Sequence, residues 1–81
     1  MSAGEMLSAA RAARGMSLDD LAQATKFRAS ILAAMEHDDF SHCGGLVYAR
    51  GQLRSIAPML GLDPEDLVDA FDDGLRRNPI D

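Results

Sequence analysis

The sequence has few of the residues that define several common classes of protein. Aromatic residues make up only 5% of its 81 residues and tryptophan is absent, so the core must be built from aliphatic side chains and methionine. Cys43 is the single cysteine, which excludes an intramolecular disulfide and fits a reducing, cytoplasmic compartment. No apolar run approaches the roughly 20 residues of a membrane-spanning helix, and the first residues lack the basic and apolar regions of a signal peptide.

The chain also lacks the residue combinations of an enzyme or a metal centre. It has no concerted Ser, His and Asp arrangement, no phosphate-binding glycine loop and too little length for a deep pocket, so we expect neither catalysis nor a cofactor. The segment 37–43 contains four candidate metal ligands, but their spacing matches no standard zinc pattern; they are His37, Asp38, His42 and Cys43. We interpret His37 as a helix end and Cys43 as a packed apolar group. The aspartates between positions 69 and 73 have no calcium loop around them and are interpreted as a solvated face.

The net charge of −5 is unevenly distributed along the chain. Residues 1–60 carry six basic and six acidic side chains, whereas residues 61–81 carry seven acidic side chains against two arginines. The acidity therefore belongs to the C-terminal segment. The first 60 residues are neutral, which neither forbids contact with phosphate groups nor drives it.

Apolar periodicity and capping residues predict five helices, over about 4–14, 18–24, 29–37, 46–60 and 64–74. The second and third are short and are joined by a three-residue turn, which is the arrangement of a helix-turn-helix. The predicted fold class is therefore all-α, a five-helix λ-repressor-like DNA-binding-domain fold. We expect this domain to span residues 1–74, with 75–81 forming a flexible C-terminal tail or the start of a linker.

Local features refine three of these helices. Ser17 and Asp20 have the spacing of a capping box at the start of the second helix. Gly51 lies in the middle of the fourth helix at a cost of about 1 kcal/mol relative to alanine, so we expect another backbone to approach it closely. Pro58 predicts a kink or an early end of the same helix. Asp63 followed by proline predicts the start of the fifth helix.

The third helix, which would read DNA in such a fold, has little to read it with. Base edges are contacted mainly by Arg, Lys, Asn and Gln. The residues expected to face solvent are instead Ala29, Ser30, Ile31, Ala33 and Ala34. Specific recognition of an operator is therefore disfavoured, although weak and salt-sensitive binding remains open. The residues best placed for such contacts are Lys26, Arg28, Ser30, Ile31, Arg11 and Arg14.

Three stretches of sequence together resemble the cytoplasmic domain of the RodZ family, which comprises membrane-anchored bacterial cell-shape factors. They are AARAARGMSLDDLAQATKFRASILAAME at 9–36, VYARGQLR at 47–54 and LGLDPEDL at 60–67. The resemblance implies a cytoplasmic domain that binds the actin-like filament protein MreB, largely through its fourth helix. It also implies an aromatic pair one turn apart on that helix. Tyr48 matches the first position, but Gln52 departs from the second.

The fourth helix is therefore the predicted protein-binding element, through Tyr48, Arg50, Gln52 and Arg54. An exposed tyrosine beside two arginines is typical of interface hot spots. The alternative is a solvated face on which Tyr48 packs against the preceding loop and Arg50 pairs with a nearby acid.

Two functions follow from the sequence. The first is a RodZ-like cytoplasmic adaptor linked to cell shape or the cytoskeleton, with at most weak, non-specific DNA binding. In that case, attachment to a membrane would require a segment not present in this chain. The second is a DNA-binding transcriptional regulator of the Cro/repressor type, which would pair two-fold to read half-sites.

Overall fold

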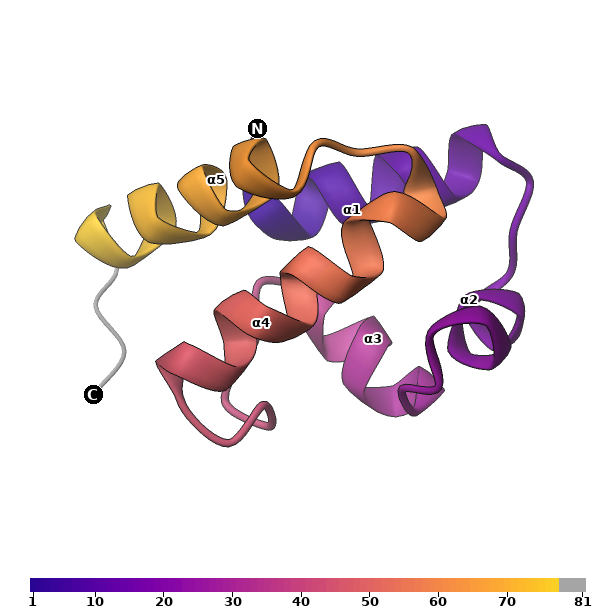
Figure 1. Cartoon of the computed structure of the whole chain (residues 1–81), viewed down its shortest axis with the longest axis horizontal. Helices are drawn as coiled ribbons and strands as arrows, with labels where there is room; N and C mark the ends of the chain where they lie inside the picture. Colours follow the sequence, from indigo (N-terminus) through magenta and orange to yellow (C-terminus); the bar gives the residue numbers. More distant parts are fainter. Residues whose placement is uncertain (78–81) are drawn as a thin grey trace.

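A computed structural model describes residues 1–77 of the chain, and this part is entirely helical. Its elements are α1 (Ala3–Ala13), α2 (Leu18–Thr25), α3 (Ala29–Glu36), α4 (Leu46–Ile56), the 3₁₀ helix η1 (Ala57–Leu60) and α5 (Pro64–Arg77). Figure 1 shows α1 and α5 side by side, with the helix-turn-helix pair α2 and α3 at one end and α4 below. The predicted all-α fold with five α-helices and a helix-turn-helix is confirmed for the described residues.

Two capping boxes set the starts of α1 and α2. The Ser17 hydroxyl accepts from the Asp20 amide at 3.0 Å, and the Ser17 amide donates to the Asp20 carboxylate at 3.0 Å. The predicted box at this position is confirmed. Ser2 and Glu5 make the same reciprocal pair, at 3.1 and 2.9 Å, and start α1 one residue earlier than expected. These hydrogen bonds satisfy backbone amides that a helix cannot pair internally.

The ends of α4 and α5 compare differently with the prediction. Near Pro58 the α-helix gives way to η1 at Ala57, as the missing proline amide predicts. The prediction that the last helix ends at Gly74 was wrong, because α5 continues to Arg77. Arg76 pairs with Asp73 at 2.5 Å, one turn earlier, and supports this final turn. The remainder of the predicted tail, 78–81, lies outside the described residues.

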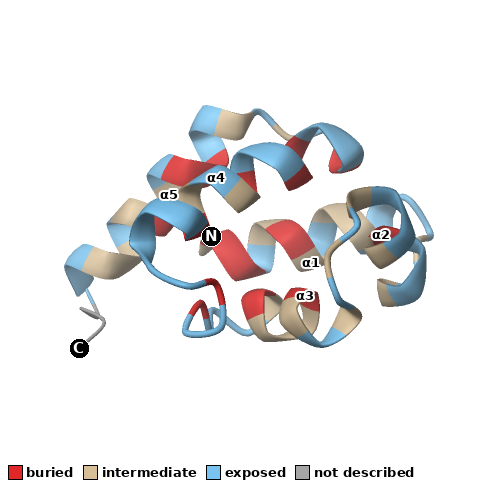
Figure 2. Cartoon of the chain, turned by 60° about the horizontal axis from the view of Figure 1, so that its bottom comes forward, coloured by how far each residue is buried: buried red, intermediate tan, exposed pale blue. Residues whose placement is uncertain are grey.

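The core lies between α1, α3, α4 and α5, where the buried segments face one another in Figure 2. It is largely aliphatic and, within residues 1–77, contains no buried charged or polar residue. Phe40 is buried and meets Phe71 edge-on, with ring centroids 4.7 Å apart and planes at 70°. The burial of Phe40 was not predicted, because the segment around it has the composition of a loop. Cys43 is buried beside it, as predicted.

The close backbone approach occurs at Gly4 and not at Gly51. A Cβ atom on Gly4 would lie 2.6 Å from the Met35 carbonyl oxygen and 2.7 Å from an Asp38 carboxylate oxygen. Asp38, with φ of 61°, accepts from the Gly4 amide at 2.8 Å and from the Ser2 hydroxyl at 2.8 Å. A Cβ on Gly51 would meet no atom within 4 Å, so the prediction for Gly51 was wrong.

Candidate functional site on the fourth helix

Large apolar side chains on the described surface gather on α4 and η1. Apart from Met1, the exposed ones are Leu46, Val47, Tyr48 and Met59, with exposed fractions of 39%, 77%, 66% and 46%. The opposite side of α4 is buried through Ala49, Leu53 and Ile56. The helix α4 therefore presents apolar side chains both to the core and to solvent. Packing within this domain does not require the exposed ones.

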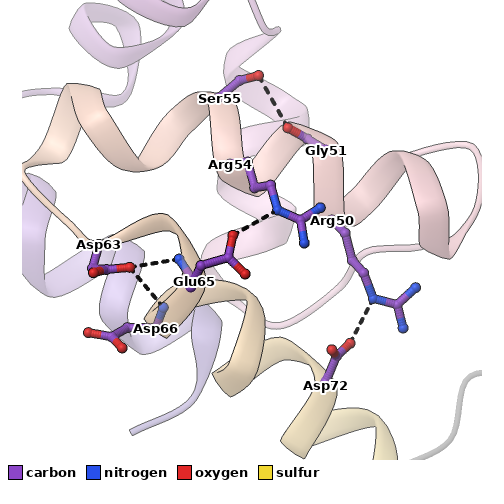
Figure 3. Close-up of polar contacts among 8 residues, drawn as sticks. All are labelled: Arg50, Gly51, Arg54, Ser55, Asp63, Glu65, Asp66 and Asp72. Carbon is purple, nitrogen blue, oxygen red and sulfur yellow. Dashed lines mark hydrogen bonds and ion pairs between the residues drawn. The ribbon is translucent and has the colours of Figure 1, made fainter.

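Helical spacing places a small set of residues on the solvent side of α4. We define the outer face of α4 as Val47, Tyr48, Gly51, Arg54 and Ser55, all of which are exposed. The ring of Tyr48 lies beside the Gly44–Gly45 turn, which is the packing on the loop that the alternative interpretation predicted. The Ser55 hydroxyl donates to the Gly51 carbonyl at 3.2 Å (Figure 3). The centre of the outer face therefore carries only the small residues Gly51 and Ser55. Val47 and Tyr48 lie at one end of the face, and Arg54 lies at the other.

The two arginines of α4 are engaged by carboxylates of α5, as Figure 3 shows. Arg50 Nε lies 2.8 Å from Asp72 Oδ1, and its guanidinium carbon lies 5.8 Å from the ring centroid of Phe71. Arg54 Nε lies 3.1 Å from Glu65 Oε1, in a more exposed pair. The pairing of Arg50 with a nearby acid was predicted for the alternative in which this side of α4 is a solvated face. Both charges are thus neutralised within the fold.

Gln52 points into the fold and not towards solvent. Its Nε2 donates to the carbonyl of Cys43 at 3.2 Å, and its Oε1 is buried without a hydrogen-bond partner among the described residues. Gln52 therefore ties α4 to the preceding loop. Gln52 stands where the resemblance implies a second aromatic residue, so this chain lacks that aromatic side chain and has a link to the loop instead.

Sequence reasoning missed most of the outer face. It selected Tyr48 and Arg54, but not Val47, Gly51 or Ser55. Their position around the helix axis identifies the missed residues, because they lie opposite the buried residues Ala49, Leu53 and Ile56.

The residues proposed for DNA contact are less available than expected. Arg11 Nε and Nη2 lie 2.6 and 2.9 Å from the two carboxylate oxygens of Glu36, and Arg11 Nη1 donates to the Met16 carbonyl at 2.9 Å. This bidentate pair joins α1 to α3, so Arg11 is not free to bind phosphate. Arg14 remains exposed, with its guanidinium beside Gly61.

The prediction of a solvent-facing third helix was wrong for most of its residues. Of the five side chains expected to be exposed, only Ser30 is; the others, Ala29, Ile31, Ala33 and Ala34, are half-buried. Ile31 packs against the core. The reason is that α3 contacts both α1 and α2, and short side chains allow those neighbours to cover them. This surface offers one hydroxyl where a reading helix offers several amides or guanidinium groups.

Three cations have no ion-pair partner among residues 1–77, namely Arg14, Lys26 and Arg28. Lys26 ends α2 with φ of 67°, and Arg28 precedes α3 without a side-chain capping bond. They lie at the ends of three different helices, and the exposed residues of α3 include no Arg, Lys, Asn or Gln. Contacts from such cations to phosphate position a protein on DNA but carry no sequence information.

The described residues contain no group of three or more His, Cys, Asp or Glu side chains placed to hold a metal ion. His42 and Asp39 form only an exposed pair, with 3.6 Å between Nε2 and Oδ2. Within residues 1–77, no helix has the length and apolar character needed to traverse a membrane. Burial and the nearby Asp39 raise the pKa of the Cys43 thiol, so this cysteine stays protonated and unreactive.

Comparison with known proteins agrees with the helix-turn-helix fold. The family described as "Helix-turn-helix domain" matches residues 6–67, which includes α2, α3, α4 and η1. The chain is also 39% identical over 71 residues to the "Cytoskeleton protein RodZ" of Streptococcus pneumoniae (strain ATCC BAA-255 / R6). That match covers 88% of this chain and 26% of the relative. No solved structure matches the chain significantly. The chain therefore belongs to the helix-turn-helix domain family, and most of its length is similar to one part of a RodZ protein.

Proposed function

We propose that the domain is a cytoplasmic adaptor that binds a cytoskeletal filament protein of the MreB type through the outer face of α4. The observation that carries the proposal is the exposure of Val47 and Tyr48 side by side, at 77% and 66%. An exposed tyrosine next to an exposed valine is a residue combination suited to a protein contact, since aromatic side chains are enriched in interface hot spots. The relative's name, a cytoskeleton protein, supports the same class of partner.

The four predicted contact residues have different roles in this proposal. Tyr48 is the principal contact, because it combines an apolar ring with a polar tip on an exposed turn. Arg54 lies at the rim, where its partner Glu65 is also exposed. Arg50 and Gln52 hold α4 against α5 and the preceding loop, and so act on the site only by positioning the helix.

The sharpest test adds bulk at the centre of the face. Gly51→Lys introduces a long side chain where no atom lies within 4 Å, and lysine is a better helix former than glycine. We expect an equally or more stable domain that no longer co-sediments with MreB-type filaments. Gly74→Lys is the matched control, because it also replaces an open helical glycine, but on α5. Equal binding by Gly51→Lys and the control would show that the outer face of α4 is not the site.

A second variant tests the contact itself. Tyr48→Ala removes the ring without touching the core, so folding is expected to change by less than about 0.5 kcal/mol. Binding to filaments is expected to fall by at least about tenfold, which corresponds to a hot-spot residue. Unchanged binding would remove Tyr48 from the interface.

The alternative, a regulator of the Cro/repressor type, has less support. Arg11 is committed to Glu36, and Ser30 is the only exposed position among the five expected on α3. Selection from random duplexes at physiological salt tests it directly. Recovery of an enriched motif would establish sequence reading, whereas binding confined to low salt would indicate phosphate contact through Arg14, Lys26 and Arg28.

A further inference from the structure

The surface formed by α4 and η1 is apolar at both ends and carries charge of one sign only. Its exposed large apolar side chains are Leu46, Val47, Tyr48 and Met59. Residues 46–60 include Arg50 and Arg54 but no aspartate or glutamate. The carboxylates that pair with these two arginines come from α5. A protein that binds along α4 and η1 therefore meets apolar, small and basic groups.

Of the two arginines, only Arg54 is available to a binding protein. Arg50 Nε lies 2.8 Å from Asp72 Oδ1, and its guanidinium also lies over the Phe71 ring. Arg54 and Glu65 are joined by one hydrogen bond of 3.1 Å from Nε, and their side chains are 48% and 67% exposed. An exposed ion pair of this kind contributes little to stability. The Arg54 side chain can therefore leave Glu65 at low cost.

A protein that covers the outer face of α4 removes water from the Arg54 guanidinium. Most of its N–H donors are on Nη1 and Nη2, whereas its hydrogen bond within residues 1–77 uses Nε. Donors that lose water without gaining an acceptor weaken binding. A carboxylate is the best acceptor here, because its two oxygens can accept from the planar guanidinium at once. The geometry therefore favours a binding protein with an acidic side chain at this position.

A basic side chain on the binding protein fits this surface less well. It would pair with Glu65 and leave the Arg54 guanidinium without a carboxylate beside the apolar contact. Glu65, in contrast, does not need Arg54. It is well exposed to water, and it lies in the first turn of α5, where the helix dipole favours a negative charge.

We infer that Arg54 exchanges ion-pair partners on binding: it leaves Glu65 and pairs with a carboxylate of the MreB-type protein, beside the apolar contact of Val47 and Tyr48. This inference rests on the proposed function, and adds to it the charge of the surface that the domain recognises. Glu65 competes for Arg54 in the free domain and so lowers the affinity. One ion pair replaces another, so the affinity of the parent chain depends little on salt.

The test measures the affinity of the full chain and of two variants for polymerised MreB-type protein. Both side chains are exposed, so neither change disturbs the core. Arg54→Gln removes the cation, and we expect binding to weaken at least about fivefold. Glu65→Gln removes the competing carboxylate, and we expect binding to tighten about two- to fivefold. The affinity of Glu65→Gln should also fall more steeply than that of the parent chain as the salt concentration rises.

Two control variants make the same changes of charge outside the contact. Arg28→Gln and Asp66→Asn alter exposed residues without an ion-pair partner in residues 1–77, and both should bind as the parent chain does. A control that changes affinity as much as its matched variant would assign the effect to net charge, and the inference would be wrong.

The directions of the two effects decide the result. Tighter binding by Arg54→Gln with weaker binding by Glu65→Gln would mean that the MreB-type protein presents a basic group, which overturns the inference. Weaker binding by both would mean that the pair only holds α4 against α5, which also overturns it. If neither variant changes the affinity while Tyr48→Ala loses binding, the inference is wrong and the proposed function stands. If the parent chain does not bind, the proposed function fails and the inference fails with it.

Discussion

The glycines at positions 4 and 51 have opposite effects on the stability of the fold. At Gly4 the helix α1 passes so close to the end of α3 that a Cβ would lie 2.6 Å from the Met35 carbonyl oxygen. At Gly51 nothing lies within 4 Å, and the glycine only weakens the helix. Folding requires the first glycine and does not require the second.

Alanine at the two positions is therefore expected to act in opposite directions. Gly4→Ala must push α1 away from backbone oxygen atoms, which costs on the order of 1–3 kcal/mol of unfolding free energy. Gly51→Ala should add about 0.5–1 kcal/mol, because alanine is the better helix former. Urea denaturation of both variants and the parent chain measures these differences. A destabilised Gly51→Ala would mean that the fold needs the glycine after all.

The pair formed by Arg11 and Glu36 is the strongest single polar link between α1 and α3. It is bidentate, at 2.6 and 2.9 Å, and the side chains are only 21% and 8% exposed. Arg11→Ala would leave the mostly buried Glu36 carboxylate without its partner, and we expect a loss of roughly 2–3 kcal/mol. Arg28→Ala is the control, since Arg28 is exposed and makes no capping bond. Equal unfolding midpoints for the two variants would contradict this account.

Residues that act locally could be predicted, and residues that act across the fold could not. Ser17 and Asp20 are three positions apart, so their capping box follows from the sequence alone. Arg11 and Glu36 are 25 positions apart, and their contact depends on how α1 packs on α3. For the same reason the burial of Phe40 in the core could not be deduced from its loop-like surroundings.

At the scale of elements, the helix starts were easier to predict than the surfaces the helices expose. The amides of Glu65 and Asp66 donate to the Asp63 carboxylate at 2.8 and 3.3 Å, as the Asp-Pro start of α5 predicts. The exposed side of α4 was predicted less well, because the Arg50 side chain pairs with Asp72 and the Gln52 side chain donates to the Cys43 carbonyl. The faces of short helices depend on neighbouring elements, which a single periodicity does not specify.

The two capping boxes make stability depend on pH. Hydrogen bonds from Ser2 lower the pKa of Glu5, and hydrogen bonds from Ser17 lower the pKa of Asp20. Because these folded-state pKa values lie below those of the unfolded chain, the stabilisation is complete above the unfolded values. It is lost as the pH falls below the ordinary values of 4.5 for Glu5 and 3.8 for Asp20 and through the lower pKa values of the folded state.

Removing the two charges should therefore make the unfolding free energy depend less steeply on pH under acidic conditions. The double variant Glu5→Gln and Asp20→Asn keeps a hydrogen-bonding group at each position but cannot titrate. We expect it to be less stable than the parent chain at pH 7 and to approach the parent chain's stability at pH 3. Unfolding free energies measured across this range provide the check. Parallel curves for the two proteins would show that the boxes do not carry the pH dependence.

At the scale of the whole molecule, the cationic side chains that lack a carboxylate partner lie away from the outer face of α4. Within residues 1–77, five arginines are paired with carboxylates, and only Arg14, Lys26 and Arg28 are left without such a partner. These three lie at the ends of α1 to α3 and not on the outer face of α4. The proposed protein contact and the cations available to phosphate therefore lie on different parts of the surface.

Ionic strength should separate the two kinds of binding. Contact with filaments through Val47 and Tyr48 buries apolar groups, so we expect affinity to change by less than about threefold between 50 and 300 mM salt. Three phosphate contacts would release about three counterions, so affinity for duplex DNA should fall by about 100-fold over the same range. Titrations of labelled duplex and of polymerised MreB-type protein, run in the same buffers, measure both slopes. A steep slope for filaments would mean that Arg54 and its pair with Glu65 dominate the contact, and that the apolar side chains are secondary to it.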